Sequence, residues 1–305
     1  MAIEVNSATL GAINNGLTLA YNTQFYRAPT PHARFCYNAP STGREEVYPR
    51  LDMMAGPREW LGDRIYRSLS QAQFSIVNKK FEHTITVGRE DIEDDKVGMY
   101  SQVAAQMGEA AGVFPATLVA ALMKSGKTTV AYDGQYFFDT DHPGWDATGA
   151  AIATVSNYQS GASPGWYLID NSKVLKPFII QTRVPFSLTT RFDPNDPNVF
   201  DRDEFVWGTR ARMAAGFGLW QLAFYSEAAF TKANLIAART AMASIYRPDG
   251  SPMGIMPNTV VVPSTLYPKA MSFYRNNQVM NAGGTALEDN DIVNMFEPIE
   301  FPWLN

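Results

Sequence analysis

The apolar spacing of this chain changes abruptly near residue 88, and this change constrains the fold more than any other feature. Apolar and polar residues alternate over 81–87, as in a β-strand with one buried face. Beyond that point the apolar residues recur every three or four positions, as along one face of a helix. The expected stripe comprises Met99, Val103, Met107, Ala110 and Phe114. The chain is therefore expected to lead from a strand directly into a long amphipathic helix.

Charge marks both ends of this predicted helix. Acidic side chains stabilise the positive end of a helix dipole. The first turns hold Glu90, Asp91, Glu93, Asp94 and Asp95. Lys124 and Lys127 flank Gly126 near the expected far end. A helix over 89–124 would have about nine turns and a length of about 50 Å, and Pro115 is expected to kink or split it.

Local patterns before the helix predict three further elements. Residues 7–27 carry apolar side chains at helical spacing and predict a short amphipathic helix that docks on another element. Residues 28–57 contain repeated prolines and predict an extended arm or loop. Residues 74–88 predict a β-hairpin with its turn at 78–80, and His83 is expected on its packed face.

The second half of the chain predicts a mixed sheet with helices. Residues 144–165 are rich in Gly, Ala and Ser, which is typical of a flexible loop or insertion. Residues 193–198 predict a tight polar turn. The expected strands lie at 166–170, 174–186, 204–208 and 259–263, and the expected helices at 233–247 and 264–275.

The composition fits a globular protein and excludes several functional classes. A chain of 305 residues with 46% hydrophobic residues can bury a large core in one large domain or two modest ones. Its formal net charge of -5 lacks the basic footprint of a dedicated DNA-reading protein, although a surface that merely encloses nucleic acid remains compatible. The single Cys36 excludes an intramolecular disulfide and favours a reducing compartment; we expect this thiol to be buried.

The chain carries no targeting or membrane pattern. The N-terminus lacks the basic and apolar regions of a signal peptide. The longest apolar run, at 113–123, is far shorter than the ~20 residues that span a bilayer. We therefore expect a soluble chain that is made in a cytoplasm and has no membrane partner.

Two short motifs invite a chemical interpretation, and both have simpler explanations. Residues 126–128 match the end of a phosphate-binding loop, but Ala121 stands where its first glycine belongs, and the match follows a helical pattern instead of a strand. Asp139, Asp141 and His142 are possible ligands of a divalent metal, but three such residues so close together before a proline more often form a hydrogen-bonded turn. No nucleophile, base and orienting group can be assembled. We expect no catalytic site, no metal and no cofactor, and this favours assembly as the function.

The order of several longer phrases resembles a known family. They lie at 58–64, 81–100, 132–143, 166–170, 176–183, 211–224 and 248–263. In these phrases the chain resembles the major head subunit of Mu-like tailed phages, the T-protein family. The positions that carry the resemblance are Trp60, Gly62, Arg89, Glu90, Asp91, Asp94, Asp95, Gly98, Tyr100, Asp133, Gly134, Asp139, Asp141, His142, Pro143, Lys176 and Pro177.

The resemblance implies an α+β capsid fold of the Hong Kong ninety-seven type. Its parts would be an N-terminal arm with the start of an extended loop (1–57), the extended hairpin loop and its return strands (58–88), a spine helix (89–127), and peripheral and axial subdomains (128–305). The implied function is that of a structural major capsid protein whose copies self-assemble into an icosahedral shell around phage double-stranded DNA.

The same resemblance implies the partners and the location. The chain would bind itself in pentamers and hexamers, together with scaffold, portal and decoration proteins. It would enclose DNA without reading its sequence, assemble in the cytoplasm of a bacterial host and end in the virion capsid. Two alternatives stay open at this point: a non-viral compartment shell of the same fold, and a nucleotide- or metal-dependent enzyme that uses Lys127 or the cluster at 139–142.

Replacing Lys127 with alanine separates the capsid from the nucleotide enzyme. If the phosphate-loop match is accidental, Lys127→Ala leaves shell assembly intact in electron micrographs. If the parent chain binds a nucleotide and Lys127→Ala abolishes that binding, the enzyme is favoured instead.

Overall fold

The computed structural model describes residues 6–49, 73–94, 97–193, 196–281 and 283–305. The helices are α1 (Ser7–Arg27), α2 (Arg89–Glu93), α3 (Val97–Lys124), α4 (Pro197–Arg202), α5 (Lys232–Ala243) and α6 (Tyr267–Arg275). The strands are β1 (Cys36–Pro40), β2 (Glu45–Pro49), β3 (Gln73–Val77), β4 (Lys79–Gly88), β5 (His142–Trp145), β6 (Ala151–Val155), β7 (Tyr158–Gln159), β8 (Trp166–Ile169), β9 (Phe178–Arg191), β10 (Glu204–Phe217), β11 (Ala223–Ser226), β12 (Thr259–Val262), β13 (Gln278–Met280), β14 (Leu287–Asp289) and β15 (Glu297–Glu300).

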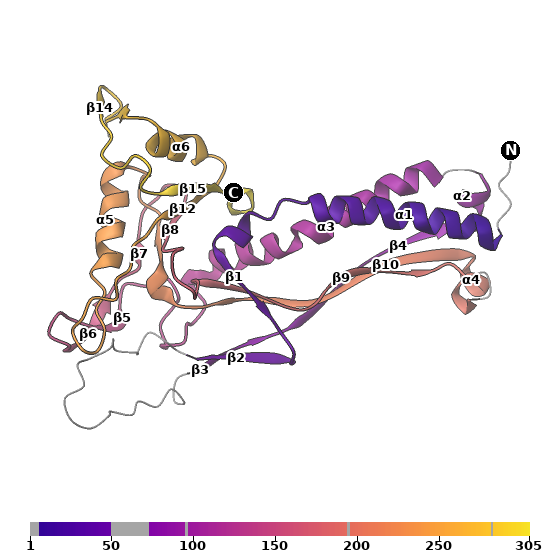
Figure 1. The fold of residues 1–305 in the computed structure, drawn as a ribbon, viewed down its shortest axis with the longest axis horizontal. Coiled ribbons are helices and arrows are strands. Elements are labelled where there is room, and N and C mark those ends of the chain that lie inside the picture. Colours follow the sequence, from indigo (N-terminus) through magenta and orange to yellow (C-terminus); the bar gives the residue numbers. More distant parts are fainter. Residues whose placement is uncertain (1–5, 50–72, 95–96, 194–195, 282) are drawn as a thin grey trace.

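Two sheets organise an elongated α+β molecule (Figure 1). The first sheet has the order β1-β9-β10-β4, in which β1 runs parallel to β9 and the other neighbours are antiparallel. The second sheet has the order β15-β12-β8-β11-β7. Helices α1 and α3 lie along one face of the first sheet, whereas α5 and α6 lie beside the second sheet at the other end (Figure 1). Short ladders pair β2 with β3, β5 with β6, and β13 with β14.

The two long helices lie unusually close together at two glycines of α3. A Cβ atom on Gly108 would stand 2.1 Å from the carbonyl oxygen of Tyr21, and one on Gly112 would stand 2.7 Å from that of Phe25. Real Cβ atoms do not approach backbone so closely, so only glycine fits both positions. Because the glycines meet α1 in ascending order, the two helices run parallel.

The helix pair is joined to the first sheet by apolar packing and two hydrogen bonds. Leu10, Leu17, Phe205 and Trp207 are almost fully buried in one cluster. The indole N–H of Trp207 donates to Asn14 Oδ1 at 3.1 Å. The hydroxyls of Tyr21 and Thr209 lie 3.0 Å apart. These contacts fix the face of β10 that the helices cover.

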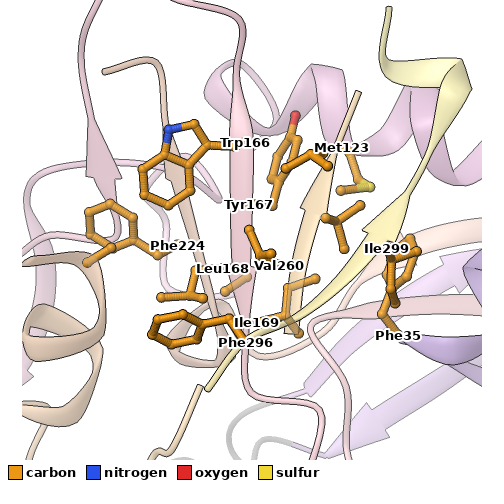
Figure 2. Close-up of a cluster of buried hydrophobic side chains, with 14 of the residues drawn as sticks. Phe35, Met123, Trp166, Tyr167, Leu168, Ile169, Phe224, Val260, Phe296 and Ile299 are labelled. Carbon is orange, nitrogen blue, oxygen red and sulfur yellow. The ribbon is translucent and has the colours of Figure 1, made fainter. Parts of the chain in front are cut away.

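The largest core surrounds the second sheet (Figure 2). Strands β8 and β12 are buried along their whole length, which explains their uninterrupted apolar sequences. The core also contains Phe35, which precedes β1, and Met123, near the end of α3 (Figure 2). The core therefore joins the second sheet to the elements of the first.

The predicted strands, helices and buried cysteine are confirmed at many positions. The helices expected at 7–27, 233–247 and 264–275 are present as α1, α5 and α6. Helix α1 packs on α3, as expected of a helix that docks on another element. The strand expected at 259–263 is β12. Cys36 is buried, and burial raises the pKa of its thiol well above the usual value, which keeps it protonated and unreactive.

The predicted β-hairpin at 74–88 is wrong. Strand β3 pairs with β2, and β4 pairs with β10, so β3 and β4 do not pair with each other. Only Asn78 separates them, and the chain continues forward through this residue. A tight hairpin needs a loop of at least about two residues. His83 is exposed, contrary to the expected packed position.

The predicted helix differs from the observed one in its start and in its buried face. Residues 89–93 form the separate helix α2, and α3 then continues through Pro115 to Lys124, so that Pro115 does not split it. Met99 is 68% exposed and Val103 40% exposed, whereas Ala104 and Ala111 are buried. Met107 of the predicted stripe is buried against Tyr21 as expected, so the stripe was wrong only in part, where the small residues Ala104 and Ala111 take the buried face.

Other predictions in the second half were also wrong in part. Residues 144–165 are not a structureless loop, because they include β6, β7 and half of β5. The strands expected at 166–170, 174–186 and 204–208 do not share one mixed sheet: β8 belongs to the second sheet, and β9 and β10 belong to the first. Residues 28–57 are not simply an arm, since β1 lies in the first sheet beside β9. Helix α4 begins at Pro197, inside the turn expected at 193–198, of which residues 194 and 195 lie outside the described residues.

Helix α3 also has the length and composition of a membrane span over Gly98–Lys127, of which 44% is buried in the fold. The core helix of a soluble protein passes the same test. Its apolar character is explained by α1 on one side and by the core around Met123.

The glycine contact between α1 and α3 predicts opposite effects for two similar substitutions. Gly108→Ala places a methyl group against the Tyr21 backbone and should lower the free energy of unfolding by about 2 kcal/mol. Gly98→Ala lies in the same helix with nothing within 4 Å and should raise it by up to about 1 kcal/mol. Urea denaturation of the unassembled subunit measures both. Equal effects of the two changes would contradict the close packing.

Candidate functional site

The polar residues that the sequence singled out do not form a reaction centre. No group of three His, Cys, Asp or Glu side chains in the described ranges is arranged to hold a metal. Asp139 accepts hydrogen bonds from the backbone N–H of Tyr136 at 3.3 Å and of Thr140 at 2.8 Å, as expected of a turn. Asp141 is exposed, whereas the His142 side chain is completely buried. The three side chains therefore have separate surroundings.

His142 is the centre of a buried polar group that we call the histidine node: Asp133, His142, Asn157 and Trp220. Its Nδ1 lies 2.7 Å from Asp133 Oδ2, and its Nε2 lies 3.2 Å from Asn157 Oδ1. The ring stacks on Trp220 with the ring centres 3.9 Å apart. Both ring nitrogens are occupied, so His142 has no lone pair available for a metal.

The hydrogen-bond roles in the histidine node follow from its neighbours. Asn157 Nδ2 donates to the carbonyl oxygen of Phe137 at 2.8 Å, which leaves Asn157 Oδ1 as the acceptor for the N–H of Asp139 and for His142. His142 Nε2 is therefore a donor, and one proton lies between Nδ1 and the Asp133 carboxyl group. The node holds the segment 133–142 against the second sheet through a chain of hydrogen bonds.

Lys127 belongs to a second polar cluster, which links the end of α3 to the second sheet. Its Nζ lies 2.7 Å from Glu227 Oε1 and 5.4 Å from the ring centre of Tyr158. The hydrogen bond to Glu227 raises the pKa of Lys127. Burial alone would raise the pKa of Glu227, but the bonds from Lys127, Tyr158 and Tyr225 outweigh it and lower that pKa.

This geometry does not support a phosphate-binding loop at 126–128. Lys127 points to a carboxylate, and a Cβ atom on Gly126 would stand 2.3 Å from the ring of Phe138, so the glycine serves packing. The segment follows α3 as a short 3-10 helix, whereas a phosphate loop joins a strand to a helix. Because Lys127 is 41% exposed, its ion pair contributes little to stability.

The other family-motif residues have structural contacts where they are described. Arg89 Nε forms an ion pair with Asp203 at 2.6 Å. The Tyr100 hydroxyl donates to Asp91. Lys176 Nζ donates to the carbonyl oxygen of Asn171, and the Pro177 carbonyl oxygen accepts the N–H of Gly218 at 2.8 Å. Gly134 has φ +93°, which favours glycine. Trp60, Gly62 and Asp95 lie outside the described residues.

The β2–β3 ladder is the most distinctive surface feature. It packs on the face of the first sheet that is turned away from α1 and α3, where Ile76, Ala39, Ile179 and Ala214 form a small core. A Cβ atom on Gly216 would stand 2.4 Å from the Ile76 side chain. Beyond β2 and β3 lies the connection 50–72, outside the described residues (Figure 1).

An open groove lies beside this ladder. It has a volume of about 580 Å³ and is bounded by β3, the end of α3, residues 129–132 and the end of β10. Its lining is mostly apolar, and Lys79 is its charged residue. A groove whose lining has no carboxylate, histidine or cysteine suits packing of another chain segment better than chemistry on a small molecule.

Several large apolar side chains are exposed on the helices of the first sheet. They are Leu19 and Tyr26 on α1, Met99 and Val103 on α3, and Phe200 on α4. Phe200 is 86% exposed and lies on the helix between β9 and β10, at the far end of the molecule (Figure 1). Met99 and Val103, which belong to the predicted apolar stripe, thus remain available for contact with another molecule.

Sequence reasoning missed most of these surfaces. The spacing of Gly108 and Gly112 signals a close helix contact, and the isolated Gly216 in a strand signals a close approach. The histidine node had no local signal, because Asp133, Asn157 and Trp220 are joined to His142 only by the fold.

Comparison with known proteins gives consistent matches over nearly the whole chain. The profile of the family described as Mu-like prophage major head subunit gpT matches residues 10–304. The Mu-like prophage FluMu major head subunit of Haemophilus influenzae is 37% identical over 246 residues, which cover 79% of this chain and 80% of that protein. The major capsid protein of Escherichia phage Mu is 34% identical over 267 residues, which cover 86% of this chain and 87% of that protein.

Solved structures agree with the sequence matches. The chain superposes on the procapsid of bacteriophage JBD30 with a TM-score of 0.80 and 35% identity, over 98% of this chain and 100% of the other. It also superposes on the JBD30 capsid decorated with minor capsid protein trimers, with a TM-score of 0.75, 28% identity, and 91% and 92% coverage.

The histidine node predicts a large stability loss for a change that keeps the ring stack. His142→Phe retains an aromatic ring against Trp220 but leaves buried Asp133 Oδ2 without its partner and removes one of the two donors to Asn157 Oδ1. We expect the free energy of unfolding to fall by about 3 kcal/mol or more. Asp141→Asn, at an exposed position in the same turn, should change it by less than about 0.5 kcal/mol. A His142→Phe subunit as stable as the parent in urea would contradict the node.

Proposed function

This chain belongs to the family of Mu-like prophage major head subunits, gpT, and from that membership we propose that its copies form pentamers and hexamers of a closed shell around phage double-stranded DNA. The chain is a structural major capsid protein of the virion head and not an enzyme. The observation that carries the proposal is the match of nearly its whole length to a procapsid subunit, at a TM-score of 0.80. A fold shared over a complete chain leaves little room for an added function.

The arrangement of the helices and sheets supports an assignment of each element to a part of a capsid subunit. The β2–β3 ladder, with the connection 50–72, is proposed as the base of the extended loop. Helices α2 and α3 are proposed as the spine, the first sheet with α1 as the peripheral part, and the second sheet with α5 and α6 as the axial part. Residues 7–27 are proposed as the part of the N-terminal arm that forms a helix on the spine, since α1 packs along α3.

The elongated subunit suits assembly through several modest contacts. Heterologous contacts between identical copies close into rings when the rotation permits, and closure adds the contacts of many subunits together. The groove beside β3 and the exposed apolar residues on α1, α3 and α4 supply surfaces of this kind. A subunit with such surfaces gains more stability in a shell than alone.

The remaining partners are proposed from relatives and charge. Minor capsid protein trimers decorate the JBD30 capsid, which supports a decoration partner here. Scaffold and portal proteins are proposed on the resemblance alone, and so is assembly in the host cytoplasm. The formal net charge of -5 supports enclosure of DNA without sequence reading. A non-viral compartment shell differs only in its cargo, and nuclease-protected DNA inside particles from the host would decide between them.

Expression of the chain alone tests the proposal. Electron microscopy of the purified protein should show closed particles, or pentamers and hexamers when a scaffold is required. A chain that stays strictly monomeric at high concentration would contradict it.

A matched deletion tests the extended loop. The removal of 60–85 would also destroy β3 and most of β4, so replacement of residues 52–70 by a short Gly-Ser linker is the better variant. It keeps the β2–β3 ladder and should leave a folded subunit that forms no closed shells. Normal closed particles from this variant would rule out the loop assignment.

A further inference from the structure

One face of the first sheet carries three cationic side chains that form no ion pair among the described residues. Trp207 and Thr209 on β10 point to α1, so the alternate residues Arg210 and Arg212 point to the opposite face. Arg212 lies directly opposite Lys80 on β4. Like charges directly opposite each other on neighbouring strands destabilise a sheet. We call Lys80, Arg210 and Arg212 the cationic face.

The cationic face lies just beyond the end of the β2–β3 ladder. The ladder covers Ala214 and Gly216, which share this face of β10, and it stops short of Arg212. No helix covers the face, because α1 and α3 lie on the other side (Figure 1). Lys80 and Arg210 are exposed. The surface is therefore open to another molecule.

The cationic face also contains an unsatisfied donor. Nε of Arg212 is buried and has no hydrogen-bond partner, although buried donors are nearly always paired. Within the described residues, no ion pair joins Lys80, Arg210 or Arg212 to a carboxylate. The nearest acid across the strands is Glu82, opposite Arg210, and it accepts the Thr84 hydroxyl at 2.8 Å. A carboxylate from outside the chain would relieve the repulsion by pairing with the exposed side chains of Lys80 and Arg210.

The chain itself presents carboxylates of this kind at a different place. Glu90 and Glu93 on α2 are exposed and form no ion pair among the described residues. Lys80 and Gly88 lie eight residues apart on β4, and α2 begins directly after Gly88. At roughly 3.3 Å per residue the two positions are about 26 Å apart. Two side chains cannot span that distance. The acids therefore cannot neutralise the cationic face of their own chain.

We propose that α2 of one copy docks on the cationic face of a second copy, with Glu90 and Glu93 facing Lys80, Arg210 and Arg212. The inference rests on the proposed function, because it needs neighbouring copies in a shell. The contact joins two different surfaces, so it is heterologous and can continue from subunit to subunit around a ring. Charge complementarity of this kind fixes the register of neighbours and excludes wrong ones.

Charge reversal on the two surfaces tests the contact. Arg210→Glu alone and Glu90→Arg alone should each reduce the yield of closed particles at least about tenfold, because each places like charges together. The double variant restores opposite charges and should recover most of the parent yield. Arg239→Glu, an exposed change of the same charge on α5, should assemble like the parent. Circular dichroism verifies that all variants are folded.

The other outcomes each overturn the proposal in a distinguishable way. Single variants that assemble like the parent show that the two surfaces do not meet. Single variants that fail without recovery in the double variant show that α2 is not the occupant. Arg210→Glu particles that are normal in shape but lack DNA show that the face binds nucleic acid instead. Failure of the parent chain to assemble at all overturns the proposed function itself, and this inference with it.

Discussion

The close contact of α1 with α3 is the constraint on which the elongated half of the molecule depends. Gly108 and Gly112 let the two helices approach until backbone meets backbone. The hydrogen bonds of Tyr21 and Trp207 join the same helix α1 to the first sheet. The N-terminal segment is thereby made part of the folded body. The close packing of α1 on α3 requires that no side chain stands at Gly108 and Gly112.

Polar clusters add to the apolar core in connecting this half to the second sheet. The histidine node fixes the segment after α3, and Lys127 with Glu227 fixes the end of the helix itself. Directional bonds permit few alternative arrangements, whereas apolar contacts tolerate sliding. His142 and Lys127, which first suggested a reaction centre, therefore help to fix the position of the second sheet relative to the elongated half. In a subunit of a closed shell, that relation determines the curvature of the assembly.

The sequence predicted elements much better than it predicted their partners. The periodic segments at 7–27, 97–124 and 259–263 were recognised because each has a strong local pattern. Pairing failed where it depends on distant segments: β3 joins β2 and β4 joins β10, and no local signal distinguishes this from a hairpin. The buried face of α3 was partly misread because glycine and alanine mark it. The family resemblance was confirmed because it rests on the order of many sequence motifs. The role of His142 could not be predicted, because only the fold brings Asp133, Asn157 and Trp220 beside it.

Strand β4 forms one edge of the first sheet, and this has a consequence for the subunit before it meets its neighbours. An uncovered edge strand is a template on which other chains can add by backbone pairing. Lys79, Lys80 and Glu82 place charge along this edge, and charged side chains are a common natural defence against such addition. These charges should hinder edge-to-edge pairing of newly made copies before they assemble. The unassembled copies then remain available for ordered assembly and do not form fibres.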